Sequence, residues 1–426
     1  MSKLSNLSET LIGSEIVKLG NEINARIKNG ETIYNFTIGD FNPQIFPIPS
    51  ELEIEIIEAY KQHYTNYPSA EGILPLRESI SAFLNHYFQL SYLPNEIQVA
   101  SGGRPLIYSI YRAIVDKDDK VIYPIPSWNN NHYTHFTEGE HIAIETKVEN
   151  NFMPTASELE PFIQSATLIA LCSPLNPTGT TFEKQQLLDI CNLIITENNR
   201  RGEGKKLYLL FDQIYCTLLN GDREHYNPVG LIPEMKAYTI FVDGISKSLA
   251  ATGVRLGWSM GPAHIIAKIK AILSHVGAWA PMAEQVATAK YLTQFSNIDS
   301  YFTDFKQKIF DRLIALHNGF QQLKAEGYNV DSIEPQAAIY LSVKIDLVNS
   351  TKANGDKLNT QMDVWQYILD EAHMAIVPFS SFGSKPNSPW YRISVGTCKT
   401  ELIPIIINDL RNAIKQLKSD SALRLE

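Results

Sequence analysis

The stretches KKLYLLFDQIY (residues 205–215) and YTIFVDGISKSLAATGVRLGW (238–258) decide the fold of this 426-residue chain. Both contain a run of consecutive apolar residues that ends in polar ones, as do DKVIYPIP (119–126) and TLIALCSP (167–174). Such runs are typical of parallel strands that are covered on both faces of a sheet. A helical pattern, EKQQLLDICNLIITEN (183–198), lies between two of them, which predicts an α/β core.

The two ends of the chain have a different pattern. Apolar residues recur at helical spacing before Gly30, and the strand-like TIYNFTIG (32–39) follows. After residue 300, helical stretches alternate with the strand-like AAIYLSVKIDL (337–347) and YRISVG (391–396). A helix and one strand cannot bury themselves alone, so we expect the leading residues to join the C-terminal part. The predicted domains are a large α/β domain with a mostly parallel central sheet (46–300) and a smaller α+β domain (1–45 and 301–426).

Composition and charge exclude several classes of protein. The chain is 44% apolar and carries 37 Lys and Arg against 46 Asp and Glu, a formal net charge of −9, so attraction to nucleic acid is not expected. No stretch has the roughly 20 apolar residues of a membrane span, and the start lacks the apolar core of a signal peptide. The four cysteines have no metal-ligand spacing. We therefore expect a cytoplasmic globular protein with no metal, nucleic-acid or membrane partner.

The polar residues that end the apolar runs are the first candidates for a functional site, because ligands bind beyond the carboxyl ends of strands in open α/β sheets. Asn176 follows one run, Asp212 and Tyr215 another, and Ser246 and Lys247 a third. Lys247 stands among small residues, where a solvated surface would carry more charge. A partly buried lysine has a lowered pKa and is a nucleophile for aldehydes.

A second cluster predicts a site for an anion. In VASGGRPLIYSIYRAI (99–114) a strand is followed by Gly102 and Gly103 and then by an amphipathic helix. The glycines let backbone N–H groups at the helix start approach a phosphate. Arg255 stands eight residues after Lys247 and can contact the same phosphate.

These groups together match one cofactor. Each of these residues, considered alone, also has an ordinary structural interpretation: Asn176 as a turn residue, Asp212 as a helix cap and Tyr215 as a core residue. The amine of Lys247 suits a ligand with an aldehyde, and the guanidinium group of Arg255 suits a phosphate on the same small molecule. A ring nitrogen for Asp212 and a ring oxygen for Asn176 and Tyr215 complete pyridoxal phosphate.

The sequence also resembles a known family, the class I/II aminotransferases, which are aspartate aminotransferase-like pyridoxal phosphate enzymes of fold type I. The chain departs from the family pattern at Ser173, where the motif NPxNPTG begins with Asn, at Gln213, where DExY has Glu, and at Phe41, where proline is expected. The motifs that carry the resemblance are, in chain order, IGDFNP (38–43), YPSAEGILPLRESI (67–80), SGGRPL (101–106), PIPSW (124–128), SPLNPTG (173–179), DQIY (212–215), SKSLAATGVRLGW (246–258), FSSFG (379–383) and YRISVG (391–396).

The resemblance implies a role for each residue near the cofactor ring. Lys247 would form the internal aldimine and act as the general base that moves the proton. Asp212 would keep the pyridine nitrogen protonated, while Asn176 and Tyr215 would bond the ring oxygen. Trp128 would stack on the ring face.

The resemblance also implies residues for the phosphate and the substrate. Arg392 would clamp the substrate carboxylate, with Asn176 and the backbone of Gly39 beside it. Tyr67 would reach the phosphate from the other subunit of a homodimer. The remaining phosphate ligands would be Gly102, Gly103, Arg104, Ser246 and Arg255.

The implied activity is transamination by a ping-pong mechanism, in which an amino acid gives its amino group to the cofactor and a 2-oxo acid collects it. The first alternative is a lyase of the same fold that eliminates a β or γ substituent, for example at a carbon–sulfur bond, because the same ring and lysine serve both reactions. The second is a regulator that binds the cofactor without turnover. The sequence singles out no residue that reads the substrate side chain.

Overall fold

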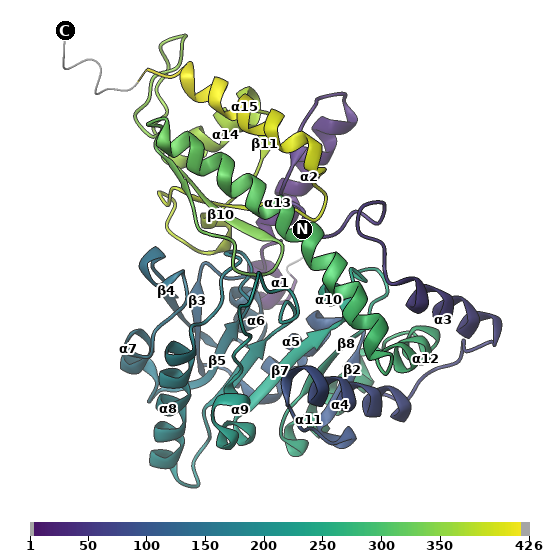
Figure 1. Ribbon diagram of the computed structural model, residues 1–426. Helices are drawn as coiled ribbons and strands as arrows, with labels where there is room; N and C mark the ends of the chain where they lie inside the picture. The colour runs from purple at the N-terminus through teal and green to yellow at the C-terminus, as the bar shows by residue number, and fades with distance from the viewer. Residues whose placement is uncertain (1–3, 419–426) are drawn as a thin grey trace.

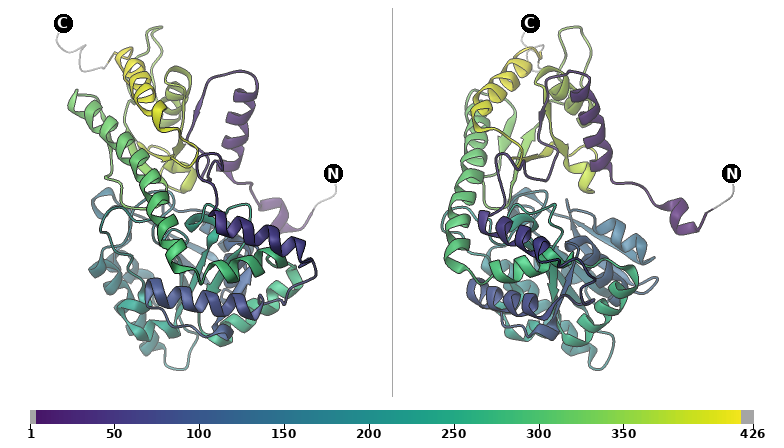
Figure 2. Two further views of the ribbon diagram at one scale, coloured as in Figure 1. Left: turned by 45° about the vertical axis from the view of Figure 1, so that its right-hand side comes forward. Right: turned by 90° about the vertical axis from the view of Figure 1, so that its right-hand side faces the viewer.

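The computed structural model describes residues 4–418 of the chain. Figure 1 shows a lower part built around a large sheet and an upper part that contains α2 (Glu15–Lys28), α14 (Gln361–Glu371) and α15 (Ile403–Lys415). The long helix α13 (Phe295–Ala325) runs from one part to the other in all three views (Figures 1 and 2). Within residues 4–418, no helix is both long and apolar enough to cross a membrane.

The large sheet has seven strands in the order β2-β8-β7-β6-β5-β3-β4. β8 runs antiparallel to its neighbours β2 and β7, and the other neighbouring strands are parallel. The four apolar runs of the sequence form β3, β5, β6 and β7, so the predicted α/β fold with a mostly parallel sheet is confirmed. The strands are β2 (Ile97–Ala100), β3 (Lys120–Ile125), β4 (Glu140–Glu145), β5 (Ala166–Cys172), β6 (Tyr208–Asp212), β7 (Thr239–Gly244) and β8 (Gly257–Met260).

Both faces of this sheet are covered by helices, which explains why the runs are apolar on successive residues. Phe211 and Phe241 pack into the core on one face, while Leu210 and Val242 pack into the core on the other. The first face is covered by α4 (Leu74–Phe88), α8 (Lys184–Arg201) and α12 (Met282–Tyr291), and the second by α5 (Gly103–Ile114) and α11 (Ala263–Val276). The remaining helices are α1 (Asn6–Thr10), α3 (Ser50–Lys61), α6 (Asn130–Phe136), α7 (Ala156–Leu159), α9 (Pro228–Leu231) and α10 (Ile245–Ser248).

A second core lies in the upper part. It contains residues of the N-terminal segment such as Ile23 and Phe36 together with residues of α13, α14 and α15. A two-residue strand, β1 (Tyr34–Asn35), pairs in parallel with β11 (Met374–Ala375), so the leading segment packs with the C-terminal part as expected. The antiparallel sheet here has the order β12-β13-β10-β9, with β9 (Val330–Ser332), β10 (Tyr340–Ile345), β12 (Val377–Pro378) and β13 (Trp390–Ser394).

The topology brings the predicted site residues to one edge of the large sheet. β5, β6 and β7 are parallel neighbours, so their carboxyl ends lie side by side. Asn176 follows β5, Asp212 ends β6, and Lys247 lies in α10 directly after β7. The helix α5 begins at Gly103 beside them, where a side chain at Gly103 would contact Val242 of β7.

Candidate active site

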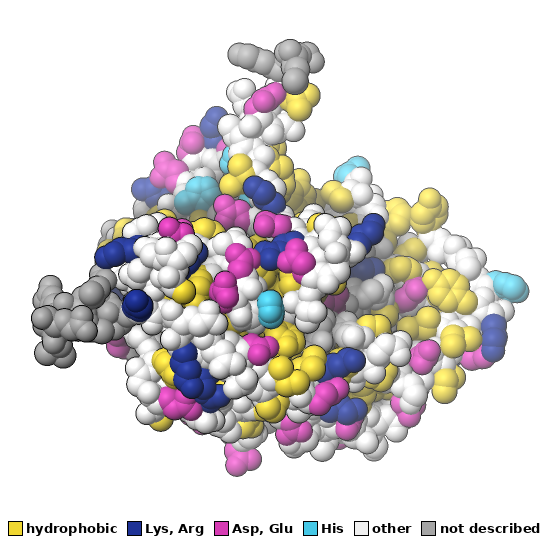
Figure 3. Space-filling view, turned by 90° about the horizontal axis from the view of Figure 1, so that it is seen from above, with side chains coloured by type: hydrophobic (Ala, Val, Ile, Leu, Met, Phe, Trp, Pro, Cys, Tyr) yellow, Lys and Arg dark blue, Asp and Glu magenta, His cyan; other side chains and the backbone are white. Residues whose placement is uncertain are grey.

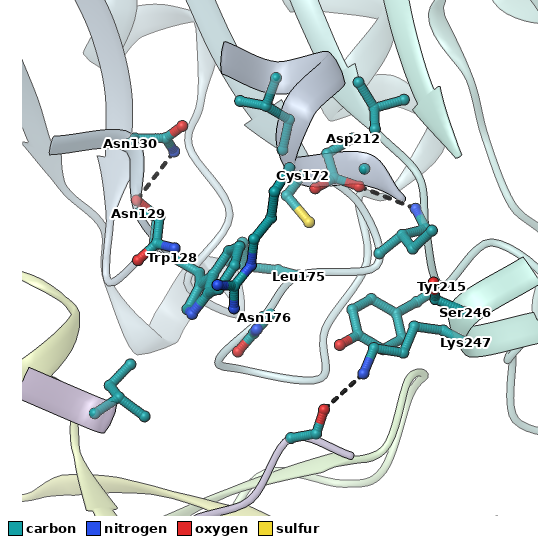
Figure 4. Close-up of a pocket in the computed structure, with 18 of the residues that line it drawn as sticks. Trp128, Asn129, Asn130, Cys172, Leu175, Asn176, Asp212, Tyr215, Ser246 and Lys247 are labelled. Carbon is teal, nitrogen blue, oxygen red and sulfur yellow. Dashed lines mark hydrogen bonds between the residues drawn. The ribbon is translucent and has the colours of Figure 1, made fainter. Parts of the chain in front are cut away.

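A cavity of about 620 Å³ opens at this edge of the sheet. Gly102 and Tyr67 do not line it, but every other predicted site residue does. Figure 4 shows residues of its wall, with Trp128 and Asn176 on one side and Tyr215, Ser246 and Lys247 on the other. The predicted residues that the structure brings together are Gly39, Gly103, Arg104, Trp128, Asn176, Asp212, Tyr215, Ser246, Lys247, Arg255 and Arg392.

The amine of Lys247 points across the cavity. Its Nζ donates a hydrogen bond of 2.6 Å to the carbonyl oxygen of Gly39 (Figure 4), and it lies 5.6 Å from the ring centre of Phe41. Burial lowers the pKa of Lys247 to about 8, although the carboxylate of Asp40 acts in the opposite direction. A substantial fraction of this amine is therefore neutral near pH 8 and can attack an aldehyde.

Asp212 is a partly buried carboxyl group that faces the cavity, and no cation is paired with it among the described residues. Its Oδ1 accepts a hydrogen bond of 3.1 Å from the backbone N–H of Ile214 (Figure 4), and none of the ion pairs among the described residues includes it. Burial raises the pKa of Asp212 to about 6. A carboxyl group in this setting fits a ligand that brings its own positive charge, such as a protonated ring nitrogen.

The hydroxyl group of Tyr215 is paired with a residue that the sequence analysis missed. Tyr215 and Tyr340 share a hydrogen bond of 2.6 Å between their hydroxyl oxygens, and both line the cavity. Burial raises the pKa of Tyr215 well above its usual value. Tyr340 begins β10 in an apolar run, where no polar neighbour marks it, so only the tertiary fold reveals it.

Arg392 lies buried on β13, with 2% of its surface exposed. Its Nη2 donates to the carbonyl oxygen of Thr37 at 2.6 Å, and its Nη1 donates to Oδ1 of Asn176 at 3.0 Å. The rings of Tyr340 and Phe382 lie 4.8 Å and 5.0 Å from its guanidinium carbon. The guanidinium group is thus held in one orientation at the cavity wall, which suits recognition of a carboxylate. The sequence analysis had not singled out Thr37 or Phe382.

Arg255 is fixed at the start of α5. Its Nη2 donates to the carbonyl oxygen of Ser101 at 2.9 Å, and its Nη1 donates to that of Thr252 at 2.7 Å. Gly102 has a φ of +92°, and a side chain there would collide with the Arg255 guanidinium group. Gly102 therefore supports Arg255 from outside the cavity, while Gly103 contributes the helix start that suits an anion.

Arg104 and Trp128 form one unit of the wall. The guanidinium carbon of Arg104 lies 4.6 Å from the ring centre of Trp128, a geometry that favours a cation on an aromatic face. Arg104 also contributes to the lowered pKa of Lys247. The positive charge of Arg104 therefore acts on the amine of Lys247 inside the cavity.

Tyr67 lies outside the cavity of its own chain. Its side chain is 84% exposed, and its ring packs edge-on against Trp279 at 5.4 Å between ring centres. The single chain therefore does not bring Tyr67 to the site.

Comparisons with known proteins agree with this geometry. The sequence model of the family described as aminotransferase class I and II matches residues 32–410. The chain is 29% identical to the aspartate aminotransferase of Bacillus sp. (strain YM-2) over 354 residues, which cover 83% of this chain and 85% of that protein. It is 28% identical to a probable aspartate/prephenate aminotransferase of Rickettsia bellii (strain RML369-C) over 364 residues, covering 84% and 86%.

Solved structures show the same fold. The crystal structure of the aspartate aminotransferase from Rhizobium meliloti superposes with a TM-score of 0.89 at 24% identity, covering 98% of this chain and 100% of that chain. The aspartate aminotransferase from Thermus thermophilus with maleate superposes with a TM-score of 0.85 at 23% identity, covering 97% and 100%. None of these relatives is named as a lyase.

The residues of the cavity fit pyridoxal phosphate: a largely neutral amine suits its aldehyde, a buried carboxyl without a cation suits its ring nitrogen, and a helix start with Arg255 suits its phosphate. The family match over 32–410 covers most of the chain. The chain belongs to the class I and II aminotransferases and is a pyridoxal phosphate-dependent enzyme that moves an amino group from an amino acid to a 2-oxo acid.

Proposed function

We propose that Lys247 is the residue that holds the cofactor aldehyde and later moves the proton of the reaction. When bound, pyridoxal phosphate supplies an aldehyde that accepts the amino group and a ring that takes up the negative charge left on the substrate Cα. In its free form, the Nζ of Lys247 would take the proton from the substrate Cα. The lowered pKa of about 8 supports this role, because a neutral amine can accept a proton.

We propose that Asp212, Asn176 and Tyr215 orient the cofactor ring and that Trp128 covers its face. Asp212 would keep a proton on the ring nitrogen, which its place at the cavity wall without an ion-pair partner among the described residues supports. Asn176 and Tyr215 line the wall where a ring oxygen would lie. Tyr340 would hold the Tyr215 hydroxyl in place through their 2.6 Å hydrogen bond.

We propose that the phosphate is bound by the start of α5 together with Ser246 and Arg255, and that Tyr67 of the partner subunit completes this site in a homodimer. Several apolar side chains on the Tyr67 side of the protein are exposed. Figure 3 shows hydrophobic side chains gathered at the right, where α3 lies in Figure 1. The exposed apolar side chains of α3 are Ile54, Ile57 and Tyr60, and Leu74 begins α4; each of the four is about half exposed in the single chain.

We propose that Arg392 binds the α-carboxylate of the substrate and that the substrate carries a second carboxylate. The relatives named as aspartate aminotransferases support a dicarboxylic substrate. The family resemblance places Arg104 at the cofactor phosphate; we propose instead that Arg104 binds the far carboxylate of the substrate. Arg255 is already bonded at the phosphate end, whereas Arg104 lies against Trp128 and makes no ion pair among those found in residues 4–418. The cavity thus offers one guanidinium group for each carboxylate.

The reaction is tested by chemistry at Lys247. Borohydride reduction of the holoenzyme followed by peptide mapping is expected to label Lys247, and the Lys247→Ala variant is expected to lose the label and the activity. The Lys290→Ala variant, which removes a surface lysine paired with Glu55, is the matched control. With an amino donor alone, the expected products are a 2-oxo acid and the pyridoxamine form. Free ammonia in their place would indicate elimination and overturn the proposal.

The substrate class is tested with Arg104→Gln. We expect kcat/KM for aspartate to fall by about tenfold to a hundredfold, because a charge-assisted contact is lost, while kcat/KM for a neutral amino acid and the affinity for the cofactor stay the same. A weaker cofactor affinity with equal losses for both substrates would instead place Arg104 at the phosphate.

We also propose two properties of the whole chain. The division into 46–300 and 1–45 with 301–426 is supported by the separate cores of the two parts. The cytoplasm is the proposed location, since the four cysteines are free, as is usual in a reducing compartment.

A further inference from the structure

Asp243 is a buried acid on β7 that the proposed reaction does not use. It is 2% exposed, and none of the ion pairs in residues 4–418 includes it. Residues alternate between the two faces of the sheet along β7, so that Val242 lines the cavity while Asp243 faces the opposite side with Phe241. Asp243 therefore lies behind the active site and has no direct access to the substrate.

The carboxyl group of Asp243 joins two segments of the active site. Its Oδ1 accepts a hydrogen bond of 2.7 Å from the backbone N–H of Gly244, where α10 begins. Its Oδ2 accepts a hydrogen bond of 3.3 Å from Nε2 of Gln213 and a weaker one of 3.6 Å from Sγ of Cys216. Gln213 and Cys216 follow β6, and Gly244 ends β7, so one side chain connects the ends of both strands.

The two connected segments carry the groups that the chemistry needs. Gln213 comes directly after Asp212, and Tyr215 follows two residues later. Gly244 leads into the single turn of α10 that carries Lys247. A shift of either segment would therefore change the position of Asp212 relative to the amine of Lys247.

The partners of Asp243 are all donors. A backbone N–H, an amide and a thiol each point to its oxygens, and such bonds favour a carboxylate. Burial opposes them and raises the pKa of Asp243 to about 7, with the charge of Asp212 acting in the same direction. On the other side of Gln213, its Oε1 is 3.3 Å from Nε2 of His225, which burial keeps neutral by lowering its pKa to about 3.

We propose that Asp243 is a positioning residue of the active site, whose carboxylate fixes the segment after Asp212 against the segment that carries Lys247. This inference rests on the proposed roles of Asp212 and Lys247. The family pattern DExY has an acid at the position of Gln213. In this chain Gln213 is an amide, and its hydrogen-bond partner Asp243 is the acid. A hydrogen bond between positions 213 and 243 needs one acid and one amide, and either position can hold the acid.

Charge and hydrogen bonding explain why one acid is required. Two carboxylates at a separation of 3.3 Å cannot both be ionised in a buried site. Two amides would leave one fewer acceptor for the three donors, and a buried donor without a partner is unfavourable. Gln213→Glu alone or Asp243→Asn alone therefore disturbs the hydrogen bond between the two side chains, and both substitutions together restore it.

The test uses Asp243→Asn, Gln213→Glu and the double variant Gln213→Glu/Asp243→Asn in the full-length enzyme. Thermal unfolding of the apoprotein reports the connection without any cofactor. Cofactor affinity and the absorbance spectrum of the holoenzyme report its effect on the site. The matched control is Ile240→Val, a buried change on the same strand, which is expected to lower the Tm and leave both cofactor measurements unchanged.

We expect each single variant to lower the Tm of the apoprotein and to weaken cofactor binding roughly tenfold, with a changed absorbance spectrum. The double variant is expected to recover most of both losses. Losses that simply add in the double variant would overturn the proposal, and so would a lower Tm with normal cofactor binding in both single variants. Failure of the proposed role of Lys247 would be recognised separately, because borohydride reduction would then label another residue, whereas the recovery of the Tm in the double variant would remain.

Discussion

The Nζ of Lys247 and the carbonyl oxygen of Gly39 are joined by a hydrogen bond of 2.6 Å, although 208 residues separate them in sequence. The bond connects α10, at the edge of the large sheet, to the N-terminal segment that packs with the C-terminal part. A side chain at Gly39 would collide with the hydroxyl group of Tyr340, so the glycine leaves room for Tyr340 beside this segment. The next residue, Asp40, places its charge near the amine and raises the pKa that burial lowers.

This arrangement predicts a pH dependence for cofactor uptake. The neutral amine of Lys247 is the form that attacks an aldehyde, so the rate at which the apoprotein takes up pyridoxal phosphate should rise with pH, with a midpoint of about 8. The Asp40→Asn variant removes a charge that raises the pKa of Lys247, and its midpoint should lie at a lower pH. Stopped-flow absorbance over a pH series measures both midpoints.

A distant carboxylate serves as the control for this series. Asp409 on α15 accepts a hydrogen bond from Tyr34 and lies outside the cavity, so Asp409→Asn should keep the midpoint at about 8. An unchanged midpoint in Asp40→Asn would show that the charge of Asp40 does not raise the pKa of Lys247.

Replacement of Arg392 by Met should separate substrate binding from cofactor binding. The change keeps the approximate length of the side chain but removes the guanidinium group, so kcat/KM should fall about a hundredfold or more for every amino donor. The affinity for the cofactor should stay close to normal, because Arg392 bonds Thr37 and Asn176 and no group at the phosphate end. Arg411→Met, which removes an arginine paired with Glu326 away from the cavity, should have normal kinetics. Loss of the cofactor from Arg392→Met would contradict the assigned role.

The Tyr340→Phe variant tests the hydrogen bond to Tyr215. Without its partner at 2.6 Å, the buried hydroxyl group of Tyr215 loses a contact, and the free energy of unfolding should fall by about 1–2 kcal/mol. Urea unfolding of the apoprotein measures this change. Tyr92→Phe is the matched control: the Tyr92 hydroxyl is buried without a hydrogen-bond partner, so its removal should not destabilise the protein. Equal effects of the two changes would argue against a contribution from the Tyr215 bond.

The sequence was most informative where a strand is followed directly in the chain by a residue of the active site. Asp212 and Lys247 come at or just after the ends of strands that are apolar on both faces, so the strand pattern alone predicted which edge of the sheet they share. The helix expected before Gly30 is α2 (Glu15–Lys28). The fold, the family and the cofactor were predicted correctly, whereas the domain boundaries and the roles of individual residues stay predictions.

Contacts between distant segments could not be predicted from the sequence. Tyr340, Thr37 and Phe382 surround Arg392 from three separate parts of the chain. Phe382 stands in the motif FSSFG, but neither that motif nor the sequence around Tyr340 and Thr37 indicates that the three residues meet at Arg392. The acid at position 243 was also missed, because within the apolar run of β7 it has no polar partner nearby in sequence. Its partner, Gln213, lies 30 residues away in sequence, directly after the neighbouring strand β6.

The exposed position of Tyr67 leads to the last prediction, which concerns the dimer. If the apolar surface around α3 is the interface, Ile57→Glu places a charge in it and should yield a monomer, measured by light scattering after gel filtration. The monomer should bind the cofactor more weakly, since Tyr67 of the partner subunit is lost. Tyr67→Phe should remain dimeric and show only the weaker cofactor binding. Ile405→Glu, on the exposed face of α15, should change neither property, and a monomeric Ile57→Glu with full cofactor affinity would rule out a contribution across the interface.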